Sequence, residues 1–174
     1  MRSKLIILTD LWGNINSNWI KVYAENLKDK FEVKIYSCCE IAEIDSFEKT
    51  EKEIHSEFIK SGIEKAVENL LKLEKEEINI LAFSVGGIIA WKSEIKGLKI
   101  RNLKAISSTR LRNEINKPNC NLKLYFGEND EYKPKKEWFE NLNVNYEIVK
   151  NAEHKVYENL DFAKKVCKNI NRNW

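Results

Sequence analysis

The feature that most constrains the fold is a short apolar run that ends directly in a serine and two glycines. The run covers residues 78–83, and Ser84, Gly86 and Gly87 follow it at the start of an amphipathic stretch over residues 85–94. A run with so little polar alternation is typical of a strand that is buried on both faces, as in the middle of a parallel sheet. Parallel strands need crossover connections, which are usually helices. The run therefore predicts a protein in which strands and helices alternate.

The rest of the chain repeats this pattern, without internal repeats, low-complexity tracts or linkers. Its 174 residues correspond to a single domain, residues 1–174. We expect an α/β fold, a three-layer α/β/α sandwich with a mostly parallel sheet of about six strands and right-handed crossovers. The other predicted strands are residues 5–8, 33–36, 103–107, 122–126 and 144–149. The predicted helices are residues 19–27 with Ser17 as cap, residues 51–74 with a joint at Ser61-Gly62, residues 135–140, and a last helix with the apolar stripe Val156, Leu160, Ala163, Cys167 and Ile170.

The composition argues against several classes of protein. The chain has 30 Lys and Arg residues and 27 Asp and Glu residues, so its net charge is +3. Its lysines are dispersed along the sequence, which disfavours a nucleic-acid-binding surface. No apolar run is long enough to span a membrane, and the run at residues 5–8 ends too soon for an export signal. We expect a cytoplasmic protein with reduced cysteines at positions 38, 39, 120 and 167. Two histidines leave few ligands for a metal, and no cofactor is expected.

In a parallel sheet, ligands bind where the strands end at their carboxyl side. Ser84 follows such a strand, with the small residues Ala82 and Gly86 two positions before and after it. Small residues at these positions relieve the crowding of a sharp strand-to-helix turn, the nucleophile elbow, which raises a serine hydroxyl above the sheet. The helix N-terminus at this turn favours a developing oxyanion. The alternative is that Ser84 only caps the helix.

Two later strand ends supply an acid and a base in an order that fits nucleophilic catalysis. Asp130 follows the fifth predicted strand, with Glu128 and Glu131 as rivals. His154 follows the sixth, whereas His55 lies on a charged helical face and is predicted to be a surface residue. A serine hydroxyl needs a base that titrates near neutral pH. The order Ser84, Asp130, His154 is therefore the predicted catalytic triad, although each residue alone is equally typical of a turn or a loop.

The elbow, the Gly-x-x-Asp-x-x-x-Pro segment at residues 127–134 and the Ala-Glu-His segment at residues 152–154 together resemble the α/β-hydrolase superfamily over nearly the whole chain. The resemblance implies an oxyanion hole formed by the backbone N–H groups of Leu11, or alternatively Trp12, and of Val85. The family commonly has a His-Gly pair after the corresponding first strand, and this chain has Thr9-Asp10 there.

The resemblance also implies a minimal form of the fold without a cap domain, similar to small serine esterases and thioesterases. Family members usually insert a lid after the fourth strand, but residues 108–121 hold a loop or one short helix at most. Arg110 and Arg112 in this loop are candidate substrate-binding residues, or solvated side chains paired with Glu114. Trp12 is predicted to line the substrate pocket or to cover the sheet edge.

The expected function is hydrolysis of a carboxylic ester or thioester through an acyl-enzyme, without a metal or cofactor. The expected substrate is a small-molecule or carrier-bound acyl ester, and the expected state is a monomer or small homo-oligomer. The alternative is a binding or scaffold protein that has lost turnover. A nucleotide-binding protein is disfavoured because neither G-x-x-x-x-G-K-[ST] nor G-x-G-x-x-G is present.

Overall fold

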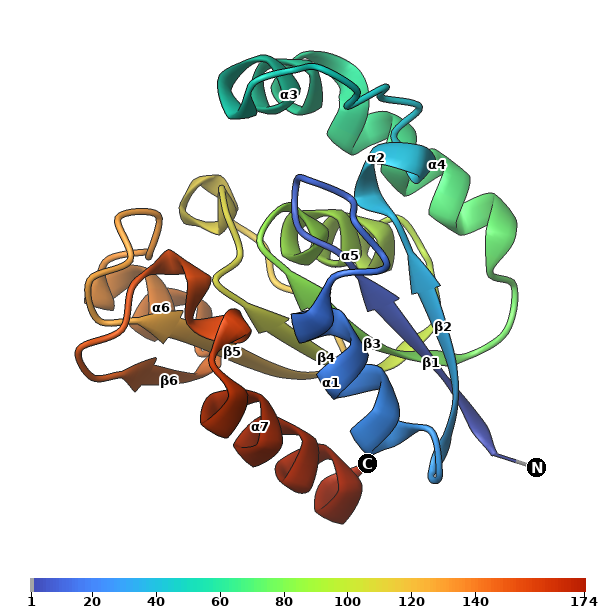
Figure 1. The fold of residues 1–174 in the computed structure, drawn as a ribbon. Coiled ribbons are helices and arrows are strands. Elements are labelled where there is room, and N and C mark those ends of the chain that lie inside the picture. The colour runs from blue at the N-terminus through green and yellow to red at the C-terminus, as the bar shows by residue number, and fades with distance from the viewer. Residues whose placement is uncertain (1) are drawn as a thin grey trace.

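A computed structural model describes residues 2–174 and shows strands alternating with helices, as predicted (Figure 1). The strands are β1 (Ser3–Leu8), β2 (Phe31–Tyr36), β3 (Ile78–Phe83), β4 (Ile100–Ile106), β5 (Asn121–Gly127) and β6 (Asn145–Val149). The helices are α1 (Asn18–Leu27), α2 (Cys38–Ile41), α3 (Glu51–Glu57), α4 (Ile63–Leu73), α5 (Val85–Ile95), α6 (Lys136–Leu142) and α7 (Leu160–Asn173), with a π-helix η1 (Phe58–Gly62) and two 3-10 helices, η2 (Leu111–Asn113) and η3 (His154–Glu158).

The described strands form one sheet in the order β2-β1-β3-β4-β5-β6. Every neighbouring pair is parallel, so the expected mostly parallel sheet is wholly parallel in residues 2–174. The register pairs Leu8 with Ala82, Ala82 with Ala105, and Ile106 with Tyr125. The strands therefore end side by side at one edge, and the chain order reverses around β1, which is where such sheets bind ligands.

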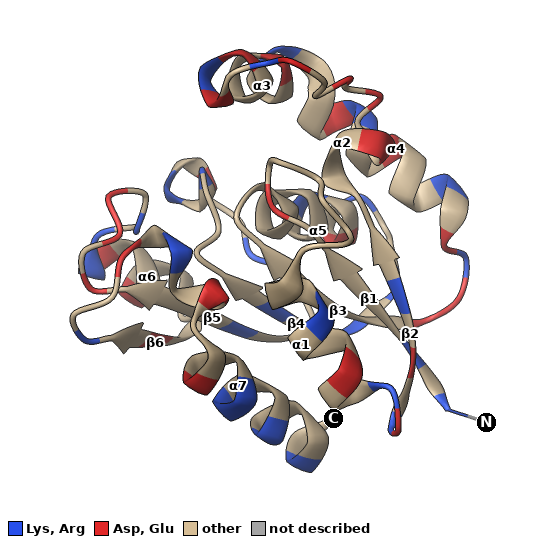
Figure 2. Ribbon diagram, viewed as in Figure 1, with Lys and Arg blue, Asp and Glu red and all other residues tan. Residues whose placement is uncertain are grey.

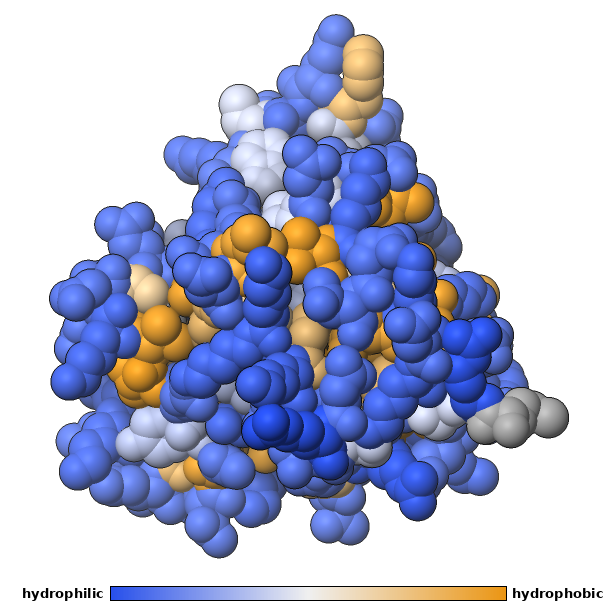
Figure 3. All heavy atoms as spheres, turned by 60° about the horizontal axis from the view of Figure 1, so that its bottom comes forward, coloured by the Kyte–Doolittle hydropathy of each residue, from blue (hydrophilic) through white to orange (hydrophobic). Residues whose placement is uncertain are grey.

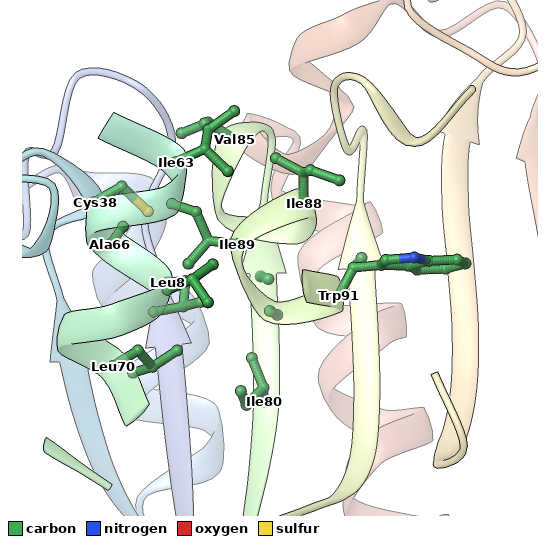
Figure 4. Close-up of a cluster of buried hydrophobic side chains, with 14 of the residues drawn as sticks. Leu8, Cys38, Ile63, Ala66, Leu70, Ile80, Val85, Ile88, Ile89 and Trp91 are labelled. Atoms are coloured by element: carbon green, nitrogen blue, oxygen red, sulfur yellow. The ribbon is translucent and has the colours of Figure 1, made fainter. Parts of the chain in front are cut away.

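The sheet is the middle layer of three, as predicted. Helices α1 and α7 cover one face, and α4, α5 and α6 cover the other (Figure 1). Strand β3 is buried at every position, as its apolar run predicts. On the face of the sheet that α4 and α5 cover, Leu8 of β1 and Ile80 of β3 belong to one buried cluster with Leu70 of α4 and Ile89 of α5 (Figure 4). Trp91 is fully buried there.

The connection from β2 to β3 departs most from the predicted elements. The predicted helix at residues 51–74 is α3 and α4, and the predicted joint at Ser61-Gly62 lies in the π-helical turn η1. Helix α2 was not predicted, and Ser37 caps it by accepting the Glu40 N–H. Thr50 begins α3 with a capping box, and α3 extends beyond the edge where the strands end (Figure 1). Between β4 and β5 there is only η2, which agrees with a fold without a cap.

The predicted start of the last helix was wrong. The last helix begins at Leu160, which is 49% exposed, while Val156 lies in the separate η3 helix. The Asn159 side chain accepts the Phe162 N–H and so begins α7 after Val156. Ser17 occupies the cap position of α1, but its side chain makes no capping hydrogen bond.

Charged residues are spread over the outer surfaces of the fold (Figure 2). On the face of Figure 3, hydrophilic residues predominate, and small hydrophobic patches lie between them. None of the helices described in residues 2–174 combines the length and apolar character needed to cross a membrane.

Candidate active site

Ser84 lies in the sharp turn between β3 and α5, with backbone angles φ 48° and ψ −117°. Positive φ is uncommon for a residue other than glycine, and such strain is concentrated at functional sites. Gly86 makes the turn possible, because a Cβ at this position would lie 2.8 Å from the Thr9 carbonyl oxygen and 2.9 Å from the Leu8 Cβ. The small residue therefore lets α5 start against the end of β1 and holds Ser84 at the helix N-terminus.

His154 begins η3, after β6, and its ring reaches the serine. Its Nε2 lies 3.1 Å from the Ser84 Oγ. Gly127 at the end of β5 allows this approach, because a Cβ there would lie 2.4 Å from the Ala152 carbonyl oxygen and 2.5 Å from that of Glu153. The segment that carries His154 therefore crosses directly over the backbone at the end of β5.

Asp130 lies in the turn after β5 and faces the other ring nitrogen. Both of its carboxylate oxygens are 3.1 Å from the His154 Nδ1. The Tyr132 N–H donates to Oδ1 at 2.9 Å, and the residue is 4% exposed. The rivals are placed elsewhere: Glu128 accepts the Asn151 N–H at 2.9 Å, and Glu131 is exposed. Of the three acidic candidates, Asp130 is the one that contacts the imidazole.

The side chain of Tyr132 packs against the histidine. Its ring meets the His154 ring edge-on, with centroids 4.9 Å apart. Arg112 donates to the Tyr132 carbonyl oxygen at 3.2 Å, and its guanidinium lies 5.9 Å from the Tyr132 ring centroid. Arg112, predicted to bind substrate, thus supports Tyr132 and is separated from His154 by one aromatic ring. Arg110 is half-buried, with φ 66°, at the start of η2.

The loop after β1 forms the opposite side of the site. The Trp12 N–H donates to the Asp10 Oδ1 at 3.1 Å, so this N–H holds the turn. Leu11 therefore remains the better candidate in this loop for an oxyanion donor, and the Cys39 thiol fixes it by donating to its carbonyl oxygen at 2.9 Å. Val85 is the first residue of α5, where backbone N–H groups have no acceptor within the helix. The Trp12 side chain is 39% exposed.

Asp10 is the second buried carboxylate of the site, and it is 4% exposed. Burial raises the pKa of Asp10 above the usual carboxyl value, and the hydrogen bond from Trp12 opposes part of this rise. The Tyr157 hydroxyl donates to its Oδ2 at 3.4 Å, and Tyr157 lies in η3 together with His154. Asp10 thus joins the β1 loop to the segment that bears the histidine.

The sequence reasoning missed the supporting roles of Asp10, Gly127, Tyr132 and Tyr157. Asp10 left a signal, because Thr9-Asp10 departs from the His-Gly pair of the resemblance, and Gly127 left one as the glycine of the Gly-x-x-Asp-x-x-x-Pro segment. His55 is exposed on α3, as predicted. All four cysteines, which lie within the described residues, are free thiols. Within residues 2–174, no group of three His, Cys, Asp or Glu side chains is arranged to hold a metal ion.

A scan against protein-family models finds no match, and a search of curated proteins finds no relative. Solved structures match over the whole chain. A hydrolase of the alpha/beta superfamily from Xanthomonas campestris has a TM-score of 0.74 at 11% identity, covering 99% of this chain and 100% of that one. A CIB-like hydrolase from Thermoplasma acidophilum has a TM-score of 0.71 at 18% identity, covering 97% and 86%.

The chain has the α/β-hydrolase fold. A structure from a study of carboxylesterases of the thaumarchaeon Nitrososphaera gargenis also matches, with a TM-score of 0.63 at 14% identity and coverage of 98% and 90%. At such low identities the likeness establishes the hydrolase fold and no activity. This version of the hydrolase fold is compact and has no cap domain between β4 and β5, as the resemblance implied.

Proposed function

We propose that this chain is a serine hydrolase that cleaves a carboxylic ester or thioester through an acyl-enzyme. One observation carries the proposal: an unbroken line of contacts at the carboxyl edge of the sheet. It runs from the Ser84 Oγ to the His154 Nε2, and from the His154 Nδ1 to the Asp130 carboxylate. Nucleophile, base and orienting acid at hydrogen-bond distance are the arrangement that activates a serine.

In the first half of the proposed reaction, the Ser84 Oγ attacks the carbonyl carbon while the His154 Nε2 takes its proton. The Asp130 carboxylate holds the Nδ1–H tautomer and stabilises the imidazolium that forms. The backbone N–H groups of Leu11 and Val85 are the proposed donors to the oxyanion, aided by the N-terminus of α5. Collapse of the tetrahedral intermediate breaks the ester or thioester bond, and His154 gives its proton to the leaving alcohol or thiol.

In the second half, water attacks the acyl group on Ser84. His154 accepts the proton of the water, the same donors hold the oxyanion, and the acid is released as the proton returns to the Ser84 Oγ. The chain's own side chains and backbone suffice for every proton transfer in this scheme.

Labelling with a fluorophosphonate tests the nucleophile. The wild-type protein is expected to gain one covalent adduct on the peptide that contains Ser84, and Ser84→Ala is expected to gain none. Ser93→Ala is the matched control, because Ser93 is a buried serine of the same helix whose hydroxyl donates to the Ile89 carbonyl oxygen. Equal labelling of wild type and Ser84→Ala would contradict the proposal.

Turnover is tested with a short-chain p-nitrophenyl ester and the corresponding acyl thioester. Activity on either substrate is expected to disappear in both Ser84→Ala and His154→Ala, and the ratio of the two kcat/KM values tells ester from thioester preference.

A non-catalytic binding protein is the second candidate, and the covering of the nucleophile favours it, since Ser84 is only 1% exposed. A folded wild-type protein that neither labels nor turns over any of these esters would support this alternative.

A further inference from the structure

A second polar region lies away from Ser84, between α7 and the outer strands β5 and β6. A groove of about 380 Å³ is lined there by charged side chains of all three elements. Lys123 and Glu147 form its floor, and Lys165, Lys168 and Arg172 of α7 form its wall. Figure 2 shows basic residues repeating along α7.

The charges in this groove are not balanced. Glu147 is its one acidic lining residue, and both of its oxygens are engaged: Oε2 lies 3.1 Å from the Lys123 Nζ and Oε1 lies 2.5 Å from the Lys165 Nζ. Among the described residues, no carboxylate oxygen lies within 4.0 Å of the side-chain nitrogens of Lys168 or Arg172. The groove therefore carries more positive charge than the protein itself neutralises.

Lys104 on β4 adds a buried cation beside this groove. It is the register partner of Lys123, so the two side chains leave the same face of neighbouring strands. Lys104 is 4% exposed, and its Nζ lies 4.3 Å from the ring centroid of Trp174. No described carboxylate pairs with it, and burial, followed by the charge of Lys123, lowers the pKa of Lys104 to about 8.

A buried charge without a counter-charge is unfavourable, and like charges directly opposite on a sheet destabilise it. The cation–π contact with the indole ring of Trp174 compensates only in part for the missing counter-charge. An anion in the groove would supply the counter-charge that Lys168 and Arg172 lack, and it would lie next to Lys123, the register partner of the buried Lys104. The guanidinium of Arg172 also suits two-pronged recognition of a phosphate or carboxylate.

We propose that the groove between α7 and β5–β6 binds a small polyanion, a molecule that carries phosphate or carboxylate groups, at a site separate from Ser84. The volume of about 380 Å³ exceeds the space taken by one phosphate ion, so a molecule with more than one anionic group fits it better. The anionic groups would meet Lys168 and Arg172, the lining cations that no carboxylate of the described residues pairs with.

Isothermal titration calorimetry at constant ionic strength tests the site, with sodium tripolyphosphate and sodium citrate as the probes and sodium chloride as the reference. At least one probe is expected to bind the wild-type protein with one site per chain and to raise its Tm above that in chloride. Binding of tripolyphosphate alone assigns phosphate chemistry, binding of citrate alone assigns carboxylate chemistry, and either result supports the site.

Two variants locate the binding. Lys104→Met and Arg172→Gln are each expected to weaken the affinity at least tenfold. Lys164→Met is the matched control on α7, because Lys164 is exposed and does not line the groove. Arg172 is exposed on the surface, so its variant keeps the test valid even if Lys104→Met folds poorly. The proposal would be overturned if Arg172→Gln bound the probes as tightly as Lys164→Met and the wild type. It would also be overturned if neither probe bound beyond the chloride reference.

Discussion

The two sides of the candidate site contain equally buried aspartates that do different work. Asp130, after β5, and Asp10, after β1, are each 4% exposed. Asp130 faces an imidazole, whereas Asp10 accepts a backbone N–H from Trp12 and the hydroxyl of Tyr157. In the proposed reaction, the β5 side supplies side chains for proton transfer, and the β1 side supplies a backbone N–H group. Burial alone does not make a carboxylate part of a proton relay; the group it faces decides its role.

Among the variants of the two sides, Asp130→Asn is expected to lower kcat the most. An amide in this place favours the wrong tautomer of His154, so kcat on a p-nitrophenyl ester is expected to fall about 10⁴-fold. Glu128→Gln is the matched control from the same turn, since Glu128 contacts the Asn151 N–H and not the imidazole. A drop of similar size in both variants would contradict the assignment of Asp130.

Gly127→Ala tests whether the β5 side depends on the close crossing of the histidine segment. The new Cβ collides with the carbonyl oxygens of Ala152 and Glu153 and displaces His154. A shift of about 1 Å is expected to lower kcat about 10²-fold. Gly97→Ala is the control, because Gly97 has φ 103° and open space around it. It should lower the free energy of unfolding while kcat stays near the wild-type value. Wild-type kcat in a folded Gly127→Ala variant would count against this account.

Asp10→Ala measures the contribution of the β1 side. Without the carboxylate, the Trp12 N–H loses its acceptor and the turn that presents Leu11 loosens. A weakened oxyanion donor should lower kcat by about 10-fold, less than the 10²–10³ for complete loss of one donor, with KM little changed. An unchanged kcat would separate Asp10 from the reaction.

The difference in stability between Asp10→Asn and the wild type should change with pH in a defined direction. Burial raises the pKa of Asp10, so the folded protein binds this proton more readily than the unfolded chain. The stability contributed by the protonated carboxyl is therefore lost as pH rises through the raised pKa. Asparagine carries no charge at any pH. The variant is expected to be more stable than wild type at neutral pH and to lose this advantage as pH falls, as urea unfolding at a series of pH values would show.

Arg112→Gln should have the smallest effect if Arg112 only supports Tyr132. A change of a few-fold in kcat/KM is expected for a neutral ester, and the same change for an ester whose acyl chain ends in a carboxylate. Arg110→Gln is the paired comparison in the same loop. A rise in KM confined to the anionic ester would instead restore the predicted substrate-binding role of that arginine.

The difference between the two sides also explains what the sequence could predict. Ser84, Asp130 and His154 each follow a predicted strand, and their side-chain chemistry can be recognised from the residue types. The same logic predicted β3, because a strand buried on both faces needs apolar residues at successive positions, whereas the edge strands β2 and β6 mix polar and apolar residues and are only partly buried. On the β1 side, the candidate oxyanion donor is a backbone group of Leu11, which depends on loop shape rather than residue type. Its placement remained a prediction for that reason.

Helix boundaries could be predicted only where the residue type along the sequence changes at the boundary. Leu160 belongs to the apolar pattern by residue type but is exposed, because the capping by Asn159 restarts the helix one turn after Val156. The short helix α2 depends on one capping bond from the Glu40 N–H to Ser37, a signal too brief for periodicity to reveal. The roles of Tyr132 and Tyr157 require contacts between segments distant in the chain.

The positive φ of Ser84 has an evolutionary consequence. Glycine adopts such angles freely, so Ser84→Gly should keep or raise the stability of the protein. The gain should be about 1 kcal/mol where the relief of backbone strain exceeds the effect of the added flexibility of the unfolded chain. A lineage selected only for robustness would drift toward glycine at this position. If Ser84 is the proposed nucleophile, a hydroxyl at this position lowers thermal stability in exchange for reactivity, and selection for the reaction would maintain it.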